Sequence, residues 1–417
     1  MNFNDIKEEL NRCLNCPTKP CMNACPLNNN IPEAIALMKE EKYAEAYREF
    51  RKTTILSSIC GRICPHGKQC EGSCTRGKID KAIEIGKIEY YLSDYIKENN
   101  LYKDEIKELS GKKVAIIGAG PSGLTCANIL SREGIEVTIY EKHDKLGGLL
   151  EYGIPKFRLE QNIIDNTLKD ILNENIKIEY NKILGENIRL EDLNQYDAIF
   201  ISIGGNVPYK MEIPGEDYEG VYFGNSILEE KNFPDFKDKV VGVIGGGDVA
   251  IDSVRTVKKL GAKDAIIIYR RKEENMPADK KEIEDAKNEG IKFIFLTNVI
   301  KVLDEDDRRI HKVECIDTEL YQDERGWTLA RNIEGTNYEM DLDYLIIATG
   351  SKVDDKVTKE LGLDIDEKGC IIVNDKKQTS NEKIFAGGLV ANSKNTVAAA
   401  SRDGMEAAKN ILEFLNN

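Results

Sequence analysis

Eight cysteines lie in the first 74 residues of the chain, in two tight runs. The runs are Cys13, Cys16, Cys21, Cys25 and Cys60, Cys64, Cys70, Cys74. Four thiolates usually hold one iron–sulfur cluster, and four soft ligands hold one structural zinc ion. Only Cys13 and Cys16 have the two-residue spacing of zinc ribbons, so the runs favour two iron–sulfur clusters over zinc or disulfides. Such a chain is expected to move electrons one at a time.

Two glycine-rich segments follow short apolar runs, and each could bind a dinucleotide. The first contains Gly118, Gly120, Pro121, Ser122 and Gly123, and the second contains Gly245, Gly247, Asp248, Val249 and Ala250. In a strand–loop–helix unit the first glycine allows a tight turn, the second lets the backbone approach a pyrophosphate, and the third permits close helix packing. The N–H groups at the helix start then bind the phosphates. The sequence therefore predicts two dinucleotide sites.

The strand after each loop ends in residues that can select the nucleotide. Glu141 ends the first of these strands, where a carboxylate can accept hydrogen bonds from ribose hydroxyls. Arg270 and Arg271 end the second strand, with no acid at the position that matches Glu141. Two guanidiniums can bind a 2′-phosphate, which a carboxylate would repel. The second loop is therefore predicted to bind NADPH rather than NADH.

The elements that position these residues follow from the hydrophobic pattern. Residues 1–110 read as helical, an alternating strand and helix pattern begins at Lys112, and residues 304–340 read as meander strands. The predicted class is α/β: a helical N-terminal iron–sulfur domain followed by two Rossmann-like dinucleotide-binding domains, the second inserted in the first. The predicted bounds are 1–110 for the helical domain, 111–238 and 345–417 for the first nucleotide domain, and 239–344 for the inserted one.

Composition narrows the class of function. The net charge is −14 and the sequence pI is about 5.1, which argues against a nucleic-acid surface and against a polybasic membrane patch. The longest apolar runs have the length of strands, and the first residues are too polar for a secretory signal. The odd total of 11 cysteines favours a reducing cytoplasm over a disulfide framework. Cys126, Cys315 and Cys370 stand in apolar contexts and are expected to be inert core residues.

A series of motifs in a fixed order resembles one known family. The motifs are RCLNCPTKPCMNACPLNNNIPEAI, ICGRICPHGKQCEGSCTRG, GAGPSGL, GGLLEYGIPKFRL, GGGDVAID, YRRKEENMPA and IFAGG. The chain resembles the small (beta) subunit of NADPH-dependent glutamate synthase. It also resembles the large subunit of NADH-dependent ferredoxin:NADP oxidoreductase and the amino-terminal half of dihydropyrimidine dehydrogenase. The resemblance implies two 4Fe-4S clusters, FAD in the first nucleotide domain and NADPH in the inserted one.

The resemblance also implies the cluster ligands. One cluster would use Cys13, Cys16, Cys21 and Cys74, and the other would use Cys25, Cys64, Cys70 and Glu89. Cys60 would then be a bystander. A glutamate in a helix is usually a solvated charge, so the residues alone do not single out Glu89. A carboxylate ligand is harder than a thiolate and is expected to alter the potential of its cluster.

Later FAD contacts are likewise implied by resemblance. They are Gly148, Leu149 and Arg158, then Gly350 and Gly388, and finally Thr396 and Val397 at the start of the last helix, whose N-terminal dipole would stabilise the reduced anionic flavin. Leu389 departs from the family, because relatives carry an Asp there that accepts a hydrogen bond from the FAD ribityl chain. Leucine cannot accept that bond, so Asn392 or water is expected to replace it, or the flavin to bind more weakly.

The expected chemistry is hydride transfer between cofactors, which needs no catalytic side chain from the protein. NADPH would reduce the flavin, and the clusters would pass single electrons to a partner. The favoured partner is a glutamate synthase large subunit supplied in trans. The alternatives are a related system for dihydropyrimidine reduction, transhydrogenation with ferredoxin, or sulfur reduction. A redox sensor or scaffold with weakened flavin binding is a third hypothesis, which rests on Leu389 alone.

Overall fold

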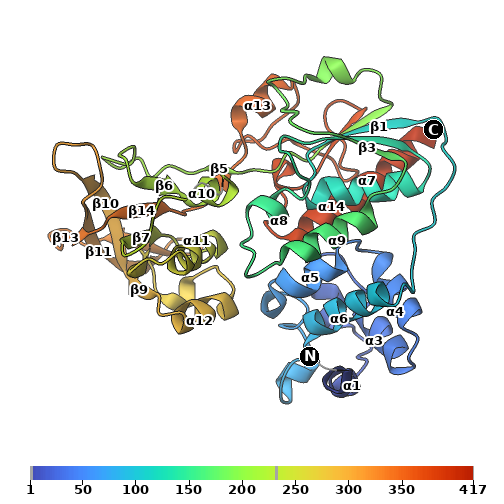
Figure 1. Ribbon diagram of the computed structural model, residues 1–417, viewed down its shortest axis with the longest axis horizontal. Coiled ribbons are helices and arrows are strands. Elements are labelled where there is room, and N and C mark those ends of the chain that lie inside the picture. Colours follow the sequence, from blue (N-terminus) through green and yellow to red (C-terminus); the bar gives the residue numbers. More distant parts are fainter. Residues whose placement is uncertain (1–2, 231–232, 417) are drawn as a thin grey trace. The chain divides into compact units, whose positions relative to one another are not determined.

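The computed structural model describes residues 3–230 and 233–416, which form two compact units (Figure 1). The first unit contains Met1–Glu151, Lys156–Gly205 and Val353–Asn417. The second contains Tyr152–Pro155 and Asn206–Lys352. Most of the second unit is therefore a single insertion in the sequence of the first.

The N-terminal part of the first unit is helical. Its elements are α1 (Phe3–Arg12), α2 (Pro20–Ala24), α3 (Ile31–Lys39), α4 (Tyr43–Arg51), α5 (Ser57–Ile63), η1 (His66–Lys68), η2 (Thr75–Lys78) and α6 (Ile85–Glu98). Helix α6 shows why they pack: Ile85, Ile88, Leu92 and Ile96 are spaced at three and four residues and are all buried. Their face meets apolar side chains from α1, α3 and α4 in one core.

The helical prediction for residues 1–110 is wrong at its C-terminal end. Helix α6 stops at Glu98, and residues 101–110 have no regular secondary structure. Asn100 has a left-handed backbone with φ of 50°, which ends the helix. The Lys107 N–H donates to the Arg132 carbonyl and the Ser110 N–H donates to the Gly134 carbonyl. The segment therefore runs along the end of the next helix instead of forming one.

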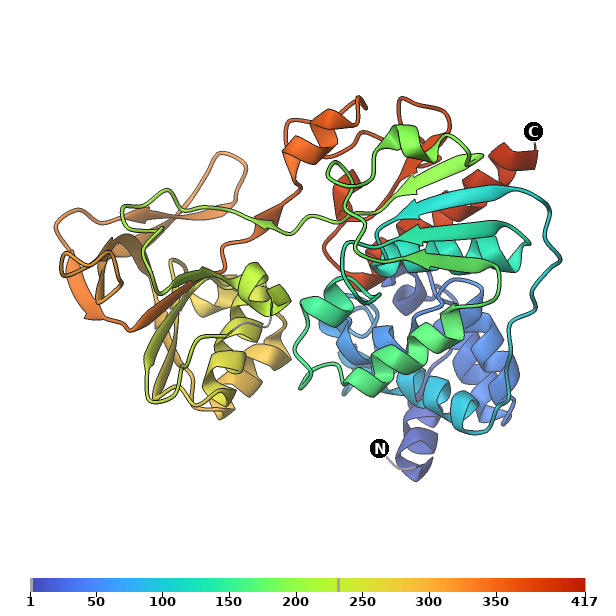
Figure 2. The same ribbon diagram turned by 45° about the horizontal axis from the view of Figure 1, so that its top comes forward.

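The rest of the first unit is built on a parallel sheet. Its strands, in spatial order, are β16 (Ile384–Ala386), β4 (Ala198–Ile201), β1 (Lys113–Ile117), β2 (Glu136–Tyr140) and β3 (Ile176–Glu179). Its helices are α7 (Pro121–Arg132), α8 (Leu149–Tyr152, which reaches the first residue of the second unit), α9 (Gln161–Ile171), η3 (Leu190–Leu193), α13 (Asp355–Glu360), η5 (Leu389–Ala391) and α14 (Val397–Asn416). Helices α7 and α14 pack side by side against strands of this sheet (Figure 2).

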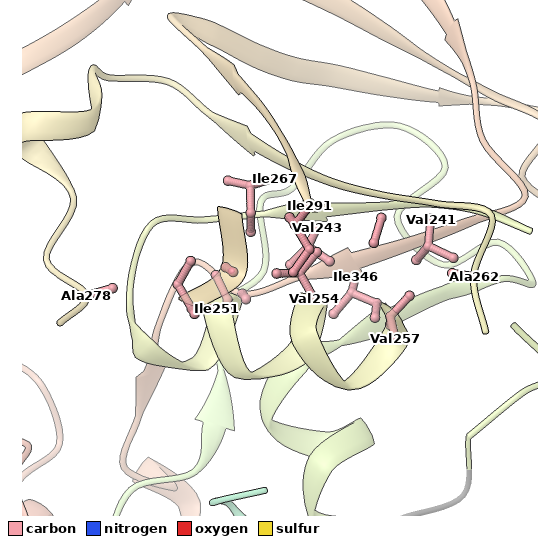
Figure 3. Packing of buried hydrophobic residues seen from close by; sticks show 14 of the residues in the cluster. Val241, Val243, Ile251, Val254, Val257, Ala262, Ile267, Ala278, Ile291 and Ile346 are labelled. Carbon is pink, nitrogen blue, oxygen red and sulfur yellow. The ribbon is translucent and has the colours of Figure 1, made fainter. Parts of the chain in front are cut away.

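The second unit holds another parallel sheet. Its spatial order is β6 (Val221–Phe223), β14 (Tyr344–Ile347), β7 (Val240–Ile244), β8 (Asp264–Tyr269) and β9 (Lys292–Phe295). Its helices are α10 (Gly224–Glu230), α11 (Asp248–Lys259), η4 (Glu273–Asn275) and α12 (Lys280–Asn288). Figure 3 shows Ile251, Val254 and Val257 of α11 packed against Val243 and Ile346 of the sheet. The central strands β14, β7 and β8 carry runs of buried apolar residues, which is typical of a parallel sheet covered by helices.

Two smaller sheets complete the second unit. The strands β10 (Thr297–Leu303), β11 (Lys312–Gln322), β12 (Thr328–Asn332) and β13 (Tyr338–Asp341) are antiparallel. The meander prediction holds for β10, β11 and β12, whereas β13 pairs with β11 instead of β12. The strands β5 (Val207–Pro208) and β15 (Ser351–Lys352) pair with each other, Val207 opposite Lys352. The two ends of the insertion are therefore held together by backbone hydrogen bonds.

The structure confirms the predicted α/β class and corrects the placement of two strands. The predicted insertion at 239–344 leaves β6 and most of β14 in the first nucleotide domain, whereas both strands belong to the second sheet. The reason is that β14 lies between β6 and β7, and strand order is a tertiary property. Within residues 3–230 and 233–416, no helix is both long and apolar enough to cross a membrane.

Candidate redox centres and nucleotide loops

The helical part contains a first cavity that gathers one predicted set of four cysteines. Cys13, Cys16, Cys21 and Cys74 all line it. Cys13 and Cys16 precede the short helix α2, and Cys21 lies in it. Cys74 comes from the turn before η2, so the fold brings segments together that are distant in the sequence. Ile31, Ile35 and Ile85 supply an apolar wall. The side chains that line this cavity are thus four thiols in a largely hydrophobic setting, which suits an iron–sulfur cluster.

A second cavity gathers the other predicted set and one further thiol. Cys25, Cys64, Cys70 and Glu89 line it, and so does Cys60. Glu89 lies on α6 and is only 5% exposed, so it is no solvated helix charge. Its Oε1 atom has no hydrogen-bond partner among the described residues. A buried carboxylate oxygen without a partner is costly unless a cation binds it, so the donor set fits a metal group.

Burial shifts the acidities in both cavities in the same direction. It raises the pKa of the Cys21 and Cys25 thiols to about 11, and it raises the pKa of Cys13 and Cys70. The pKa of Cys64 is also raised, first by a hydrogen bond with Cys60 and then by burial. Burial raises the pKa of Glu89 to about 8, and the nearby Ser57 hydroxyl offsets part of that. At neutral pH these groups therefore favour their protonated forms, and bound cations would shift them toward the ionised forms that bind iron.

The geometry differs from that of a mononuclear metal site. No three His, Cys, Asp or Glu side chains within the described ranges are arranged to hold a single metal ion. The ligands of an iron–sulfur cluster bind different iron atoms, so they need not converge on one point. The 11 cysteines are all free thiols. Cys126, Cys315 and Cys370 are buried, as predicted.

The first glycine loop joins β1 to α7. Gly118 has φ of 97°, and a Cβ atom there would lie 2.6 Å from the Ser202 carbonyl oxygen. A Cβ atom at Gly123 would lie 2.0 Å from the Gly118 carbonyl oxygen, whereas one at Gly120 would meet nothing within 4 Å. The outer glycines are therefore required by packing, and the middle one leaves open space where a phosphate could approach.

Buried polar groups, among them one hydroxyl without a hydrogen-bond partner among the described residues, lie around this loop. Glu141 is buried, and its carboxylate accepts hydrogen bonds from the Ala119 N–H at 2.8 Å and the His143 N–H at 3.0 Å. Ser122 is buried, and its Oγ has no partner among the described residues. Gly148 also lies here, because a Cβ atom on it would come within 2.9 Å of the Gly120 Cα. A buried hydroxyl beside open backbone fits a pyrophosphate at the start of α7.

The turn that follows β16 lies next to the first glycine loop. A Cβ atom at Gly388 would lie 3.4 Å from the Ser122 Cβ, so the two turns are adjacent. Thr396 caps α14, since its Oγ1 accepts from the Ala399 N–H at 3.2 Å. Leu389 begins η5 and is partly buried, with no carboxylate in its place. The carboxylate bonded to this turn is that of Asp403, which accepts from the Gly388 N–H at 2.9 Å.

Asp403 offers a test of how the Gly388 turn is held. Its other oxygen accepts from Lys377 Nζ at 2.6 Å, and its side chain is 8% exposed. We expect Asp403→Asn to lower the free energy of unfolding by about 2 kcal/mol, because a buried hydrogen bond to a charge is lost. The variant should also retain less FAD per chain than the parent, which the flavin absorbance after gel filtration measures.

Glu406 supplies the matched control. It contacts the same Lys377 Nζ at 3.4 Å, but its side chain is 29% exposed. We expect Glu406→Gln to cost under about 0.5 kcal/mol and to retain FAD, because exposed ion pairs contribute little. Equal losses of FAD in the two variants would show that Asp403 does not position the turn.

The second glycine loop joins β7 to α11. Gly245 has φ of 140°, and a Cβ atom there would lie 2.3 Å from the Ala348 carbonyl oxygen. Gly247 is open, with only the Pro277 Cγ at 3.9 Å from such an atom. Ala250 is fully buried, Val249 packs beside the apolar core, and the Asp248 carboxylate accepts from the Asp279 N–H at 3.0 Å. The crowded Gly245 and the open Gly247 correspond to Gly118 and Gly120 of the first loop.

The two arginines at the end of β8 have different surroundings. Arg270 is exposed. The guanidinium of Arg271 lies 5.4 Å from the centre of the Tyr269 ring, and its Nη1 donates to the Thr328 carbonyl at 3.5 Å. The Arg271 Nε is buried without a partner among the described residues. An orphaned guanidinium nitrogen beside an open loop fits an anionic ligand such as a phosphate.

Four remaining candidates are placed less tightly by the structure. Leu149 is 38% exposed at the start of α8, and Arg158 is half-buried in the segment that follows. Gly350 belongs to the second unit, where its carbonyl accepts from the Tyr209 N–H. Val397 is the first residue of α14, and its neighbour Ala398 lines the second cavity.

Comparison with known proteins assigns these features to a family. Residues 112–404 match the pyridine nucleotide-disulphide oxidoreductase family, and residues 1–101 match the family described as dihydropyrimidine dehydrogenase domain II, 4Fe-4S cluster. The chain is 34% identical to the small chain of the NADPH glutamate synthase of Escherichia coli, over 98% of this chain and 91% of that protein. It belongs to the pyridine nucleotide-disulphide oxidoreductase family, in the group of glutamate synthase small chains. This family membership makes it an NADPH-dependent oxidoreductase with FAD and 4Fe-4S cofactors.

Other relatives widen the group. The beta subunit of the NADPH-Fe(3+) oxidoreductase of Geobacter sulfurreducens is 33% identical, over 95% of this chain and 64% of its own length. Among solved structures, Mycobacterium tuberculosis FprA in complex with NADPH superposes with a TM-score of 0.62 at 18% identity, over 73% of this chain and 85% of that one. The thioredoxin reductase of T. acidophilum gives 0.57 at 19%, over 73% and 100%. These two structures establish the shared fold of the nucleotide units.

Proposed function

We propose that this chain is the electron-input subunit of a larger enzyme, which takes electrons from NADPH and delivers them to a separate protein. The favoured partner is a glutamate synthase large subunit. The observation that carries the proposal is the arrangement of the two cysteine cavities. Ile31 lines both of them, and the second also contains Ala398 at the start of α14. The two cavities therefore form a continuous path from α14, the helix proposed to bind the flavin, to the protein surface.

The proposed ligands are those that the family resemblance implies, and each set lines one cavity. The first cluster is held by Cys13, Cys16, Cys21 and Cys74. The second is held by Cys25, Cys64, Cys70 and the buried oxygen of Glu89, with Cys60 hydrogen-bonded to Cys64 and outside the ligand set. When bound, the flavin accepts a hydride and the clusters carry single electrons.

The proposed nucleotide contacts follow from the loops. The open backbone at Gly120 and the Ser122 hydroxyl bind the pyrophosphate of FAD, with Glu141 fixing the loop behind them. In the second unit, Gly247 leaves room for the phosphates of NADPH, and Arg270 and Arg271 bind the 2′-phosphate. The residues bind and orient the cofactors, and no side chain is needed as an acid or a base.

An anaerobic titration tests this proposal. Protein purified without oxygen should contain about eight iron atoms per chain, as two 4Fe-4S clusters require. Its flavin absorbance should bleach when NADPH is added, and the iron–sulfur absorbance should decrease with it. Zinc in place of iron, or a flavin that NADPH leaves oxidised, would contradict the proposal.

A second measurement identifies the partner. Relatives of this chain belong to enzymes named for different substrates, including ferric iron and formate. Purification of the untagged native complex, with mass spectrometry of the proteins that accompany the chain, should yield a glutamate synthase large subunit. Recovery of a different oxidoreductase would reassign the chain to that system and retain the electron-input role.

A further inference from the structure

The mouth of the first cysteine cavity carries exposed apolar side chains. Leu14 lines the cavity and is 46% exposed, and Ile79, which follows η2, is 64% exposed. The Ile79 N–H donates to the carbonyl of Arg76, another residue of the cavity wall, so both apolar residues lie at one opening. The second cavity differs, because Cys60, Cys70 and Glu89 in its wall are buried. An electron-transfer protein can therefore come closest to a cluster at the first cavity.

The same opening is surrounded by basic side chains. We call Leu14, Lys19, Lys39, Arg76, Lys78 and Ile79 the basic rim. Lys39 Nζ donates to the Cys13 carbonyl at 3.3 Å, and Lys19 Nζ donates to Asn30 Oδ1 at 3.0 Å. Neither lysine has an ion-pair partner among the described residues, and the same holds for Lys78.

The acidic groups nearby do not neutralise this rim. Asp80 is bonded to Arg76 at 2.8 Å and also to Arg12 at 3.1 Å, so one carboxylate is shared between two guanidiniums. Glu9 is occupied by Arg12 at 2.7 Å. Lys19, Lys39 and Lys78 therefore keep unpaired positive charge near this opening, on a chain whose net charge is −14.

We propose that the basic rim is the docking surface for an acidic electron-transfer protein or domain. This inference rests on the proposed function and names the chemistry of the acceptor. The negative charge of the whole chain repels an acidic partner from other faces, whereas the rim attracts it and directs its redox group to the first cavity. Leu14 and Ile79 supply the apolar centre that a specific interface needs.

Binding of an acidic plant-type ferredoxin by the holoprotein tests the docking surface. The dissociation constant should rise by about tenfold or more between about 50 mM and about 500 mM NaCl, because salt screens the attraction. Lys78→Glu and Ile79→Ser should each weaken binding at low salt, by about tenfold for the charge reversal. Lys409→Glu makes the same charge change at an exposed position near the end of α14 and should bind like the parent.

The outcomes separate the docking surface from the proposed function. Iron content and NADPH-dependent loss of flavin colour, measured on every protein, report the electron-input role without ferredoxin. A parent protein that NADPH bleaches but that binds ferredoxin equally at both salt concentrations would overturn the docking surface alone. Equal weakening by Lys78→Glu and Lys409→Glu would also overturn it, because the effect would then come from net charge. A parent that NADPH does not bleach would overturn the electron-input role instead.

Discussion

Replacing Glu89 with alanine is expected to remove iron from the second cysteine cavity and to leave the first cavity filled. The carboxylate is buried and one of its oxygens lacks a partner, so its place in the cavity is best explained by a bound cation. Loss of one ligand should lower the iron content by up to half. The spectrum of the reduced protein should lose the paramagnetic signal of one cluster and keep that of the other.

Cys60→Ser is the matched control for this experiment, because Cys60 lines the same cavity. We expect this variant to retain the iron and both signals, since serine replaces a thiol that binds no iron. The opposite result, with iron lost from Cys60→Ser and kept by Glu89→Ala, would make Cys60 the fourth ligand. Unchanged iron in both variants would remove Glu89 from the ligand set.

Changing Arg270 and Arg271 together to alanine is expected to abolish the preference for NADPH. A charged hydrogen bond contributes about 1.5–3 kcal/mol, so losing the phosphate contacts should raise the KM for NADPH by about 10–100-fold. The KM for NADH should change by less than about threefold, because NADH has no 2′-phosphate. Steady-state reduction of a small dye with each nucleotide measures both values.

Arg331→Ala controls for the loss of an arginine from the same unit. Arg331 lies on β12, the strand whose Thr328 carbonyl accepts from Arg271, but its own guanidinium pairs with Glu319 at 2.8 Å. The KM values of the Arg331→Ala variant for NADPH and NADH should match those of the parent protein. If the double variant raised the KM for NADPH and NADH by the same factor, the arginines would bind a feature that both nucleotides share.

The parts of the fold that the sequence predicts best are those with strong local signals. Apolar runs followed directly by glycines predict β1 and β7, and the structure has strands there at Lys113–Ile117 and Val240–Ile244. The role of each glycine in the first loop follows from sterics that act over a few residues. The buried cysteines outside the two runs were equally predictable, because apolar neighbours in sequence predict a core position.

Other features depend on contacts that no local pattern encodes. The register of β14 between β6 and β7 depends on tertiary pairing, so the strand cannot be assigned to a sheet from its own residues. Asp403 lies in the middle of α14, where an aspartate ordinarily faces solvent, and only the fold brings it to the Gly388 N–H. Cys60 is likewise drawn into the second cavity by packing. By contrast, the end of α6 after Glu98 has a local signal, because two asparagines follow it.

The pairing of β5 with β15 has a consequence for how this chain is assembled. Val207 and Lys352 lie opposite each other, so the nucleotide-selecting unit enters and leaves through neighbouring points. A module with adjacent ends can be exchanged for another without moving the rest of its host. We therefore expect that this unit can be exchanged for one with another coenzyme preference while the rest of the chain keeps its fold.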